Sequence, residues 1–541
     1  MYIPVGYLLT VVLIHIVDDI LCSPAAFALP KVDEKLLFRS KRDVISAAED
    51  ARSLLKGFLR LSADIPLTPK RRSNFGSQPV GYKVIDRTEY AVNKKILDEV
   101  FESDMVLTVP QLKDIIEHYQ QRKARRTRTK RKAIVGRRFR WPDNTVPYIL
   151  NGTDARWQSL IRNGMQKWEE ETCIHFKQRT DEKDYVFFFK GAGCYSSVGR
   201  IGGRQYASIG FGCESSGIIA HEIGHAIGFW HEQSRPDRDK YININEDHIF
   251  KGTKGNFEKR DDIEDLGTPY DFGSVMHYGP QAFSDDYKYV TIETKDHRFQ
   301  HTIGQRKDLS FIDVKEANEL YCSEICQKKL ACTHGGYTNP KDCRRCKCPP
   351  GLAGKLCKSL PKSHAGCGGE LYATSQWQTL QSDIVGDCYW RITASNGRVH
   401  LSVLDASYKC ESSCADDYLE IKYSKDMQQT GFRQCCNAAP GEIISETDEV
   451  IIISSATTAP SSFSLRYILD SPDIALPKAP PARWNGGGGL TSLIGAENGI
   501  DNTFEQFILK ELPRTFRSFG RSSHSDPFHL INNFLKSFLK P

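Results

Sequence analysis

Eleven residues near the middle of the chain carry the pattern most able to do chemistry. His221 and His225 stand four residues apart, and Glu222 follows the first of them. On a helix the two imidazoles lie one turn apart on one face, which suits two ligands of a single zinc ion. Gly228 lets the helix stop and the chain turn, so that His231 can come back to the metal. The spacing predicts one Zn²⁺ site with an open position for water.

The chemistry of such a site is hydrolytic. Zinc lowers the pKa of a bound water molecule and polarises a carbonyl oxygen. Glu222 lies beside the ligands without being needed as one, so it can take the water proton and deliver it to a leaving amine. The charge on the carbonyl oxygen needs a stabiliser besides zinc. Two ordinary helix histidines are the alternative, which the added Gly228 and His231 disfavour.

The elements that position these residues belong to the largest unit of the chain, residues 133–322. Helical spacing of apolar residues predicts helices there, and short apolar runs predict strands. The predicted helices are Ala155–Glu171, Ser216–Trp230 and Ser310–Tyr321, and the predicted strands are Tyr185–Phe189 and Gln205–Phe211. The zinc motif therefore lies on the second predicted helix.

Length, charge and cysteine content limit the class of protein. A chain of 541 residues is too long for one core, and a net charge of +6 gives no case for a nucleic-acid partner. The apolar run Val5–Val17 predicts a signal peptide over residues 1–22, because it is shorter than the roughly 18–20 residues that span a bilayer. No later run is apolar enough to span one. The 17 cysteines include Cys22, and the others indicate disulfides in a secreted, extracellular protein.

The segment before the zinc-binding unit predicts a propeptide. Residues 23–131 contain no cysteine and end in a basic run. Arg128-Thr-Lys-Arg131 fits the Arg-X-Lys-Arg pattern of a furin-like convertase, so cleavage is expected after Arg131. A solvated basic linker is the alternative. Just inside the next unit, Asn151-Gly-Thr is an N-glycosylation sequon and predicts a surface turn.

Three further segments follow the zinc-binding unit. Residues 326–357 hold six cysteines in too short a stretch for a sizeable core, so disulfides must stabilise it. Residues 367–468 alternate apolar and polar positions, which predicts an antiparallel sandwich. Over residues 470–541, proline-rich sequence and a glycine run predict a flexible tail.

The wider zinc motif closely resembles the signature of the astacins, a branch of the metzincins. The matching residues are His221-Glu-x-x-His-x-x-Gly-Phe-x-His-Glu232 and the later turn Val-Met276-His-Tyr278. The resemblance implies an α+β peptidase domain over residues 132–323, with an active-site cleft. It also implies that Met276 packs beneath the metal and that Tyr278 is a fifth ligand that swings away to stabilise the oxyanion.

The same resemblance implies how a precursor is kept inactive. Phe-Glu-Ser-Asp104 is similar to the family's Phe-x-Gly-Asp switch, with Ser103 in place of glycine. Its implied role is that the Asp104 carboxylate replaces the water at the zinc; a plain surface aspartate is the alternative. The N-terminus freed near Ala133 is expected to insert and meet Glu232. An internal peptide has no ammonium group to pair with that carboxylate.

Two further segments imply how substrate is held. Residues 194–213 look like the family's edge strand at the cleft, with which a substrate would pair as an added strand. Ile303-Gly-Gln-Arg306 is similar to a segment on the primed side in procollagen C-proteinases and meprins. The Arg306 guanidinium is expected to attract an acidic side chain just after the scissile bond. An ordinary surface arginine is the alternative.

The cysteine-rich and C-terminal segments resemble known modules. Residues 324–358 are similar to an EGF-like module, and residues 367–469 to a CUB domain, an all-β sandwich. The resemblances imply the pairs Cys173–Cys322, Cys194–Cys213, Cys326–Cys343, Cys332–Cys346, Cys348–Cys357 and Cys367–Cys388. The pairing of Cys410, Cys414, Cys435 and Cys436 stays open. Asp417 matches one aspartate of calcium-binding CUB domains, but a second is missing near residues 454–461.

These resemblances lead to one functional expectation with alternatives. The order of protease, EGF-like and CUB segments resembles the nematode astacins and, in reduced form, the tolloids. The expected protein is a secreted zinc metalloendopeptidase that acts on extracellular matrix or cuticle proteins, including procollagen processing. A broad matrix-degrading protease of hatching or moulting is the first alternative. A catalytically silent adhesion protein built on the EGF-like and CUB segments is the alternative of another class.

Overall fold

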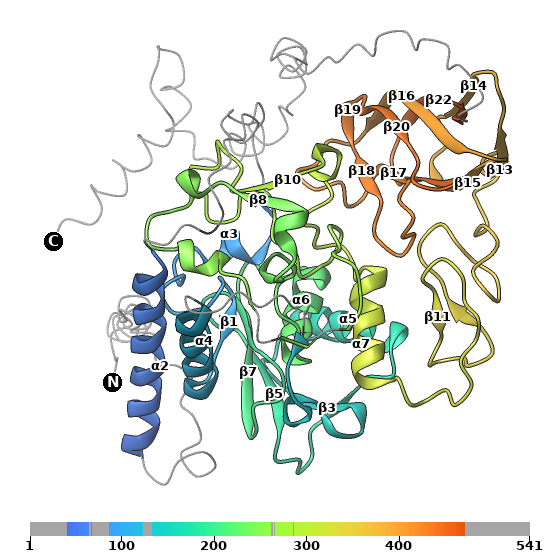
Figure 1. Cartoon of the computed structure of the whole chain (residues 1–541). Helices are drawn as coiled ribbons and strands as arrows, with labels where there is room; N and C mark the ends of the chain where they lie inside the picture. Colours follow the sequence, from blue (N-terminus) through green and yellow to red (C-terminus); the bar gives the residue numbers. More distant parts are fainter. Residues whose placement is uncertain are drawn as a thin grey trace, which may run out of the picture. The chain divides into compact units, whose positions relative to one another are not determined.

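The computed structural model describes residues 41–63, 67, 86–122, 133–260, 263–264, 266–284 and 286–470 (Figure 1). The predicted signal peptide, the predicted cleavage site at Arg131 and the tail from residue 471 lie outside the described residues. Within the described ranges, no helix is both long enough and apolar enough to cross a bilayer. The α-helices are α2 (Lys41–Ser62), α3 (Glu89–Asn93), α4 (Val109–Arg122), α5 (Ala155–Glu171), α6 (Ser216–Ala226) and α7 (Phe311–Tyr321).

A mixed six-stranded sheet forms the framework of the zinc-binding unit. Its strands are β1 (Met105–Val106), β3 (Thr145–Asn151), β4 (His175–Gln178), β5 (Tyr185–Phe189), β6 (Cys194–Ser197) and β7 (Arg204–Ile209). Their order is β1-β6-β7-β5-β3-β4. Strands β4, β3, β5 and β7 are parallel neighbours, and β6 runs antiparallel to β7. The edge position β1 is taken by the predicted propeptide, which pairs parallel to β6.

Helix α5 matches the predicted range and packs against α6 over a shared core. The Asp154 side chain caps α5 by accepting hydrogen bonds from two backbone N–H groups of its first turn. The buried indoles of Trp157 and Trp168 lie in this core, and the Trp168 Nε1–H donates to the Ala220 carbonyl at 2.9 Å. A Cβ on Gly164 would come within 2.5 Å of Ile219, so glycine permits the close approach of the two helices.

Two predicted ends are wrong by two to four residues. The predicted helix Ser216–Trp230 stops at Ala226, because Gly228 takes φ +113°, a left-handed value that ends the helix. The predicted strand Gln205–Phe211 ends at Ile209, and the chain turns through Gly212 at φ +92°. Both errors have one cause: glycine lets the backbone leave the element while the apolar pattern continues.

The predicted propeptide contains a folded helical part. Helices α2 and α4 share an apolar core with residues of the zinc-binding unit. In that core the Phe58 ring lies 5.7 Å from the Phe101 ring and 5.5 Å from the Tyr119 ring, and Phe101 in turn meets Trp230 at 6.4 Å. The helices therefore hold the segment around β1 against the strand edge at β6.

Outside the sheet and its longer helices, the zinc-binding unit is made of short elements, which lie before β3 and after β7. The short strands pair as β2 (Ala133–Ile134) with β9 (Ile263–Glu264) and β8 (Ile242–Ile244) with β10 (Ile292–Thr294). The 3-10 turns are η1 (Arg137–Phe139), η2 (Pro142–Asn144), η3 (Glu232–Ser234), η4 (Arg238–Lys240), η5 (Glu246–His248), η6 (Lys254–Phe257) and η7 (His297–Phe299). Helix α7 closes the unit, and Ser310 and Asp313 form a capping box at its start.

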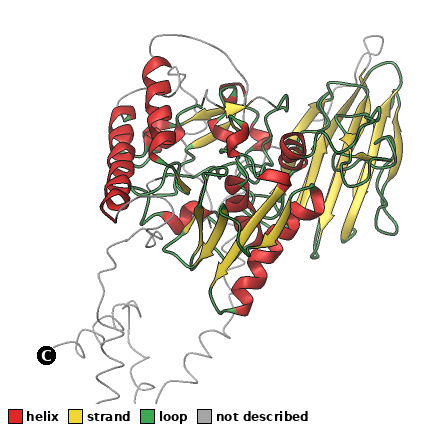
Figure 2. Cartoon of the chain, turned by 90° about the horizontal axis from the view of Figure 1, so that it is seen from below, coloured by secondary structure: helices red, strands yellow, loops and turns green. Residues whose placement is uncertain are grey.

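The cysteine-rich segment carries one small ladder, β11 (Tyr337–Thr338) with β12 (Cys346–Lys347). The C-terminal module consists of strands without a helix among its described residues (Figure 2). One sheet has the order β13-β15-β21-β17-β18, and the other has β14-β22-β16-β19 with β20 on β16. The strands are β13 (Gly369–Ala373), β14 (Gln378–Ser382), β15 (Gly386–Ala394), β16 (Arg398–Tyr408), β17 (Tyr418–Lys422), β18 (Phe432–Gln434), β19 (Cys436–Ala438), β20 (Gly441–Ile444), β21 (Glu449–Ala456) and β22 (Ser462–Asp470).

Disulfides join the pairs that the family resemblances imply. They are Cys173–Cys322, Cys194–Cys213, Cys326–Cys343, Cys332–Cys346, Cys348–Cys357 and Cys367–Cys388. The pairing left open by the sequence is Cys410–Cys436 and Cys414–Cys435. Asp417 does not face a second carboxylate in the contacts described for it; it accepts hydrogen bonds from Thr457 and Thr458 at 2.6 Å.

Candidate metal centre

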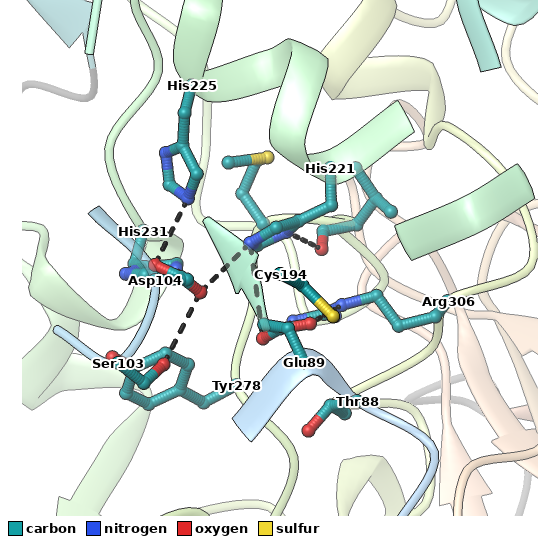
Figure 3. A network of polar contacts seen from close by, with 12 residues as sticks. Thr88, Glu89, Ser103, Asp104, Cys194, His221, His225, His231, Tyr278 and Arg306 are labelled. Atoms are coloured by element: carbon teal, nitrogen blue, oxygen red, sulfur yellow. Dashed lines mark hydrogen bonds and ion pairs between the residues drawn. The ribbon is translucent and has the colours of Figure 1, made fainter. Parts of the chain in front are cut away.

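Three imidazoles converge on one buried point (Figure 3). His221 and His225 project from α6, and the turn at Gly228 brings His231 back toward them. Asp104, from the predicted propeptide, reaches the same point. Its Oδ2 atom lies 3.3 Å from His221 Nε2 and 3.1 Å from His231 Nε2, and its Oδ1 atom lies 3.3 Å from His225 Nε2. All four side chains are fully buried.

The rings are oriented by contacts on their far nitrogens. Each Nδ1 atom faces an oxygen acceptor, so the proton belongs on Nδ1 and Nε2 is left to bind a metal. The contacts are His221 to the Val275 carbonyl at 2.8 Å, His225 to the Phe229 carbonyl at 2.8 Å, and His231 to the Glu102 carboxylate at 2.9 Å. Two acceptors are backbone atoms of the zinc-binding unit, and the third comes from the predicted propeptide.

The donor set fits zinc. The ligand atoms of Asp104 and the three histidines all lie within 4.8 Å of one another. His225 Nε2 and Asp104 Oδ1 are buried and face each other at 3.3 Å, but neither makes a well-directed hydrogen bond within the described residues. Buried polar atoms of this kind are costly unless something satisfies them. Imidazole nitrogens with one carboxylate oxygen are a ligand set that zinc accepts in a four-coordinate site.

Glu222 lies beside the metal cluster without joining it. Its side chain is fully buried, and neither carboxylate oxygen has a hydrogen-bond partner in the described part of the chain. Burial, together with the negative charges of Asp104 and Glu89, raises the pKa of Glu222 well above its ordinary value. A buried carboxyl group whose pKa is strongly shifted is of the kind found at functional sites.

The histidines differ in their electrostatic surroundings. Burial lowers the pKa of His221 to about 4, although Glu89 opposes the shift. At His231 burial acts in the same direction, but Asp104 and Glu102 outweigh it and raise the pKa to about 9. Burial alone would raise the pKa of Asp104, yet the adjacent His231 and His225 hold it well below its ordinary value. Asp104 is therefore an anionic partner of the cluster.

Tyr278 and Met276 both lie near the histidines of the cluster. The Tyr278 ring centroid is 4.6 Å from that of His231, and its hydroxyl donates to the Glu102 carbonyl. Met276 is fully buried, and its sulfur would lie 2.8 Å from a Cβ on Gly224, inside α6. Met276 thus supports the helix that carries the first two histidines.

The turn that holds Met276 is tied to α7. The Asp313 carboxylate accepts from the Ser274 hydroxyl at 2.6 Å and from the Val275 N–H at 2.8 Å. Asp313 is also the capping-box residue of α7. One buried carboxylate therefore fixes both the last helix of the unit and the turn beneath the metal cluster.

The predicted propeptide occupies the strand edge where substrate was expected to pair. Ser196 N–H donates to the Asp104 carbonyl at 2.9 Å, and β1 continues along β6 in parallel register. Next to this ladder the Asn93 side-chain amide bonds to both backbone groups of Cys194, accepting from its N–H at 2.8 Å and donating to its carbonyl. The amide of Asn93 thus takes the place of a peptide group beside β6.

Arg306 is buried, so the surface-arginine alternative is wrong. Its side chain is 3% exposed and forms a two-bond ion pair with Glu89 of the predicted propeptide. Burial raises the pKa of Glu89, but the Arg306 charge outweighs it and keeps that pKa below its ordinary value. The plain-surface alternative for Asp104 is wrong for the same reason, since Asp104 is fully buried.

Glu232 and Ala133 have other partners in this uncut chain. The Glu232 carboxylate accepts from the Asp271 N–H at 2.8 Å and lies 3.5 Å from Arg235 Nη1. Ala133 is buried in β2 and bridges to Phe229. Asn151, the predicted glycosylation site, is the exposed last residue of β3.

Sequence reasoning missed three residues of the site that precede Asp104. Glu89, Asn93 and Glu102 contact Arg306, Cys194 and His231 respectively. Glu89 and Asn93 belong to no motif, Glu102 fills the unspecified position of the Phe-x-Gly-Asp pattern, and the partners of all three lie 101 to 217 residues away in the chain. Glu102 alone offered a signal, because it stands two residues before the predicted switch residue Asp104.

Comparison with known proteins covers both main domains. Residues 134–322 match the model of the astacin peptidase family, and residues 367–467 match that of the CUB domain. Zinc metalloproteinase nas-30 of Caenorhabditis elegans is 48% identical over 470 residues, 86% of this chain and 62% of the relative. Zinc metalloproteinase nas-26 of the same species is 37% identical over 357 residues, 63% of this chain and 85% of the relative. A hatching enzyme zinc-protease, high choriolytic enzyme 1 from Oryzias latipes, is 40% identical over 34% of this chain and 92% of that chain, with a TM-score of 0.32.

The fold and the metal cluster define a metalloproteinase domain followed by a cysteine-rich segment and a CUB domain. The chain belongs to the astacin family of zinc metalloproteinases. Zinc is the cofactor of this family, and the buried cluster of three histidines and one aspartate is compatible with it. The chain spans 62% of the length of nas-30 and 56% of that of a further relative, zinc metalloproteinase nas-37.

Proposed function

We propose that the protein is a secreted zinc metalloendopeptidase, made as a latent precursor, that hydrolyses peptide bonds of extracellular proteins. The observation that carries the proposal is the convergence of three histidine Nε2 atoms on one buried point, with the carboxylate of Glu222 beside them. The predicted signal peptide, the disulfides and the exposed sequon at Asn151 support the secretory route.

In the reaction, His221, His225 and His231 would hold the metal through Nε2. When bound, zinc supplies a Lewis acid that activates water and polarises the scissile carbonyl. Glu222 would accept the proton of that water and deliver it to the nitrogen of the leaving amine. The Tyr278 hydroxyl would leave the propeptide carbonyl it now contacts and donate to the oxygen on which negative charge develops.

Latency would follow from the propeptide. Asp104 contacts all three metal-facing nitrogens and so stands where the attacking water must bind. A furin-like convertase that cuts after Arg131 would separate the propeptide from the peptidase domain. The new N-terminus near Ala133 would then move to Glu232, whose present partners include the Asp271 N–H and Arg235.

For the substrate we propose a matrix or cuticle protein with an acidic residue just after the scissile bond. The buried guanidinium of Arg306, already paired with a carboxylate, supports this preference. Procollagen processing would use such a preference, whereas a broad hatching or moulting protease would not. A catalytically silent adhesion protein is disfavoured, because the histidines, Glu222 and Tyr278 are all present and brought together.

The test is a peptide-library assay of the chain cut after Arg131. We expect the cut chain to hydrolyse peptides. Glu222→Ala should abolish this activity, and so should removal of the metal by a chelator. Added zinc should restore the activity of the chelated enzyme. Asp405→Ala, an exposed change in β16 of the CUB domain, is the matched control and should leave the activity unchanged. Activity that survives Glu222→Ala or chelation would overturn the proposal.

A further inference from the structure

Glu89 and Arg306 form a buried ion pair. Asp104 can block the metal cluster without this pair, so the pair needs an explanation of its own. Glu89 Oε2 lies 2.7 Å from Arg306 Nε, and Glu89 Oε1 lies 2.6 Å from Arg306 Nη2. Their side chains are 0% and 3% exposed. Two parallel hydrogen bonds to a carboxylate are the strongest arrangement a guanidinium can make. The pair joins the predicted propeptide to the wall of the peptidase domain.

The peptidase domain itself fixes the other edge of this guanidinium. Arg306 Nη1 donates to the carbonyls of His277 and Gln305, both at 2.9 Å. The backbone of Arg306 also packs tightly on α6, since a Cβ on Gly217 would lie 1.8 Å from its carbonyl oxygen. The orientation of the Arg306 guanidinium is therefore fixed by the peptidase domain and does not depend on the propeptide. Among the described contacts of Nε and Nη2, the only acceptor is Glu89.

The ion pair lies next to the reacting position. Glu89 Oε1 is 4.0 Å from Nε2 of His221, the nitrogen that faces the metal cluster (Figure 3). A carboxylate at this place is within reach of a residue that flanks the scissile bond. Once the propeptide leaves, Nε and Nη2 of Arg306 lose the carboxylate that they now bind, and the same edge of the guanidinium can accept the carboxylate of a substrate.

We propose that Glu89 is a substrate-like acidic side chain that the precursor carries in its own specificity subsite. The inference rests on the proposed function and deepens it. Two carboxylates hold the propeptide: Asp104 at the metal cluster and Glu89 at Arg306. A substrate with glutamate or aspartate after the scissile bond competes with Glu89 for the same guanidinium edge. The Arg306 guanidinium therefore has two successive roles: it binds Glu89 of the propeptide in the precursor, and it binds the acidic side chain of a substrate after the propeptide has left.

The experiment measures how fast the propeptide leaves the full chain after cleavage at Arg131. All variants carry Glu222→Ala, so that the measurement needs no catalytic activity and no product can form. We expect Glu89→Gln to speed dissociation at least about tenfold, because a charge-assisted pair at a buried site is lost. Asp98→Asn removes one negative charge from an exposed propeptide side chain and should change the rate less than about twofold.

A double-mutant cycle separates the pair from general destabilisation. Arg306→Leu should also speed dissociation, and adding Glu89→Gln to it should then have little further effect. The inference would be overturned if the effects of Glu89→Gln and Arg306→Leu on the dissociation rate multiplied in the double variant. It would also be overturned if Glu89→Gln dissociated no faster than the Asp98→Asn control.

A substrate measurement on the catalytically intact enzyme completes the test. Two peptides that differ only in Glu or Gln after the scissile bond should differ at least about tenfold in kcat/KM, and Arg306→Leu should remove the difference. An enzyme that is zinc-dependent but shows no such difference would reject the subsite and leave the proposed function standing. An inactive enzyme would reject the proposed function, and the dissociation cycle would still decide the role of Glu89 in latency.

Discussion

The Nε2 atom of His231 and the Oδ2 atom of Asp104 lie 3.1 Å apart, although 127 residues separate them in the chain. The contact is enclosed by protein, since both side chains are fully buried. It places a carboxylate of the predicted propeptide at the one point where the three imidazoles meet. The carboxylate proposed to keep the precursor latent therefore lies at the same position as the predicted metal site.

The first prediction concerns Asp104 itself. In a precursor made uncleavable by Arg131→Ala, Asp104→Asn should produce peptidase activity without processing. The substitution removes the charged contact to the cluster, which is worth about 3 kcal/mol or roughly a hundredfold in the closed population. The measurement is hydrolysis of a fluorogenic peptide, with Asp98→Asn as the control that stays inactive. An Asp104→Asn precursor as silent as its parent would contradict the prediction.

The second prediction concerns the backbone conformation at Ser103, in the same segment as Asp104. Its φ is +73°, a left-handed value that glycine adopts freely and that β-branched residues rarely adopt. Ser103→Val should weaken propeptide binding by about 1–2 kcal/mol, roughly 5- to 30-fold. Ser103→Gly should bind as tightly as the parent, since relief of strain offsets the loss of a 3.3 Å contact to Asp104. Dissociation rates of the nicked precursor measure both, and equal rates for Val and Gly would refute the strain argument.

One glycine of the zinc helix should not tolerate even alanine. A Cβ on Gly217 would lie 1.8 Å from the carbonyl oxygen of Arg306, a backbone atom that cannot swing aside. Gly217→Ala should destabilise the peptidase domain by about 3 kcal/mol or more. Gly57→Ala, in helix α2 with no atom within 4 Å, should be neutral or stabilise by about 0.5–1 kcal/mol. Calorimetric unfolding of the precursor compares the two, and similar effects at both positions would contradict the prediction.

The two disulfides of the peptidase domain should differ in strength. Cys173–Cys322 closes a separation of 149 residues and Cys194–Cys213 one of 19 residues. Chain-entropy arguments give about 5 kcal/mol for the long loop and about 3 kcal/mol for the short one. Replacing the first pair by alanine should therefore lower the unfolding temperature more than replacing the second. Scanning calorimetry decides the order, and the reverse order would count against a chain-entropy origin.

Asp417 predicts a pH dependence in the CUB domain. Burial raises the pKa of Asp417, but hydrogen bonds from Thr457 and Thr458 outweigh it and lower the pKa below its ordinary value. A carboxyl group whose folded pKa is lowered stabilises the fold above its unfolded pKa of about 3.9, and this stability is lost as the pH falls through the folded pKa. Asp417→Asn should flatten the loss of CUB stability between about pH 5 and pH 2, and Asp405→Ala, at an exposed position of β16, should not.

This comparison is made by urea unfolding of the full chain, followed by protease cutting within residues 367–470. The Asp417→Asn chain should be cut at lower urea than the parent at about pH 7 and at nearly the same urea at about pH 2. A parallel shift at both pH values would show that Asp417 acts through packing and not through its charge.

The zinc helix was predictable because its information is local. Two imidazoles one turn apart and a glycine that ends the helix follow from backbone geometry over eleven residues, and the structure confirms His221, His225 and His231 as one cluster. The end of the helix at Ala226 was not predictable from periodicity, because apolar residues continue to Trp230 after the backbone has turned at Gly228.

The surroundings of the cluster depended on the tertiary structure. Local patterns along the chain identify the residues that can bind zinc and the carboxylate before the peptidase domain that resembles a switch. Only the packing of α3 and β1 against β6 decided that Glu89 meets Arg306, that Asn93 takes the backbone groups of Cys194, and that Glu102 orients His231. The difference arises from the separation along the chain between the residues that interact. Spacing along a helix is set within one turn, whereas a contact across 101 to 217 residues is set by how whole elements fill the space between them.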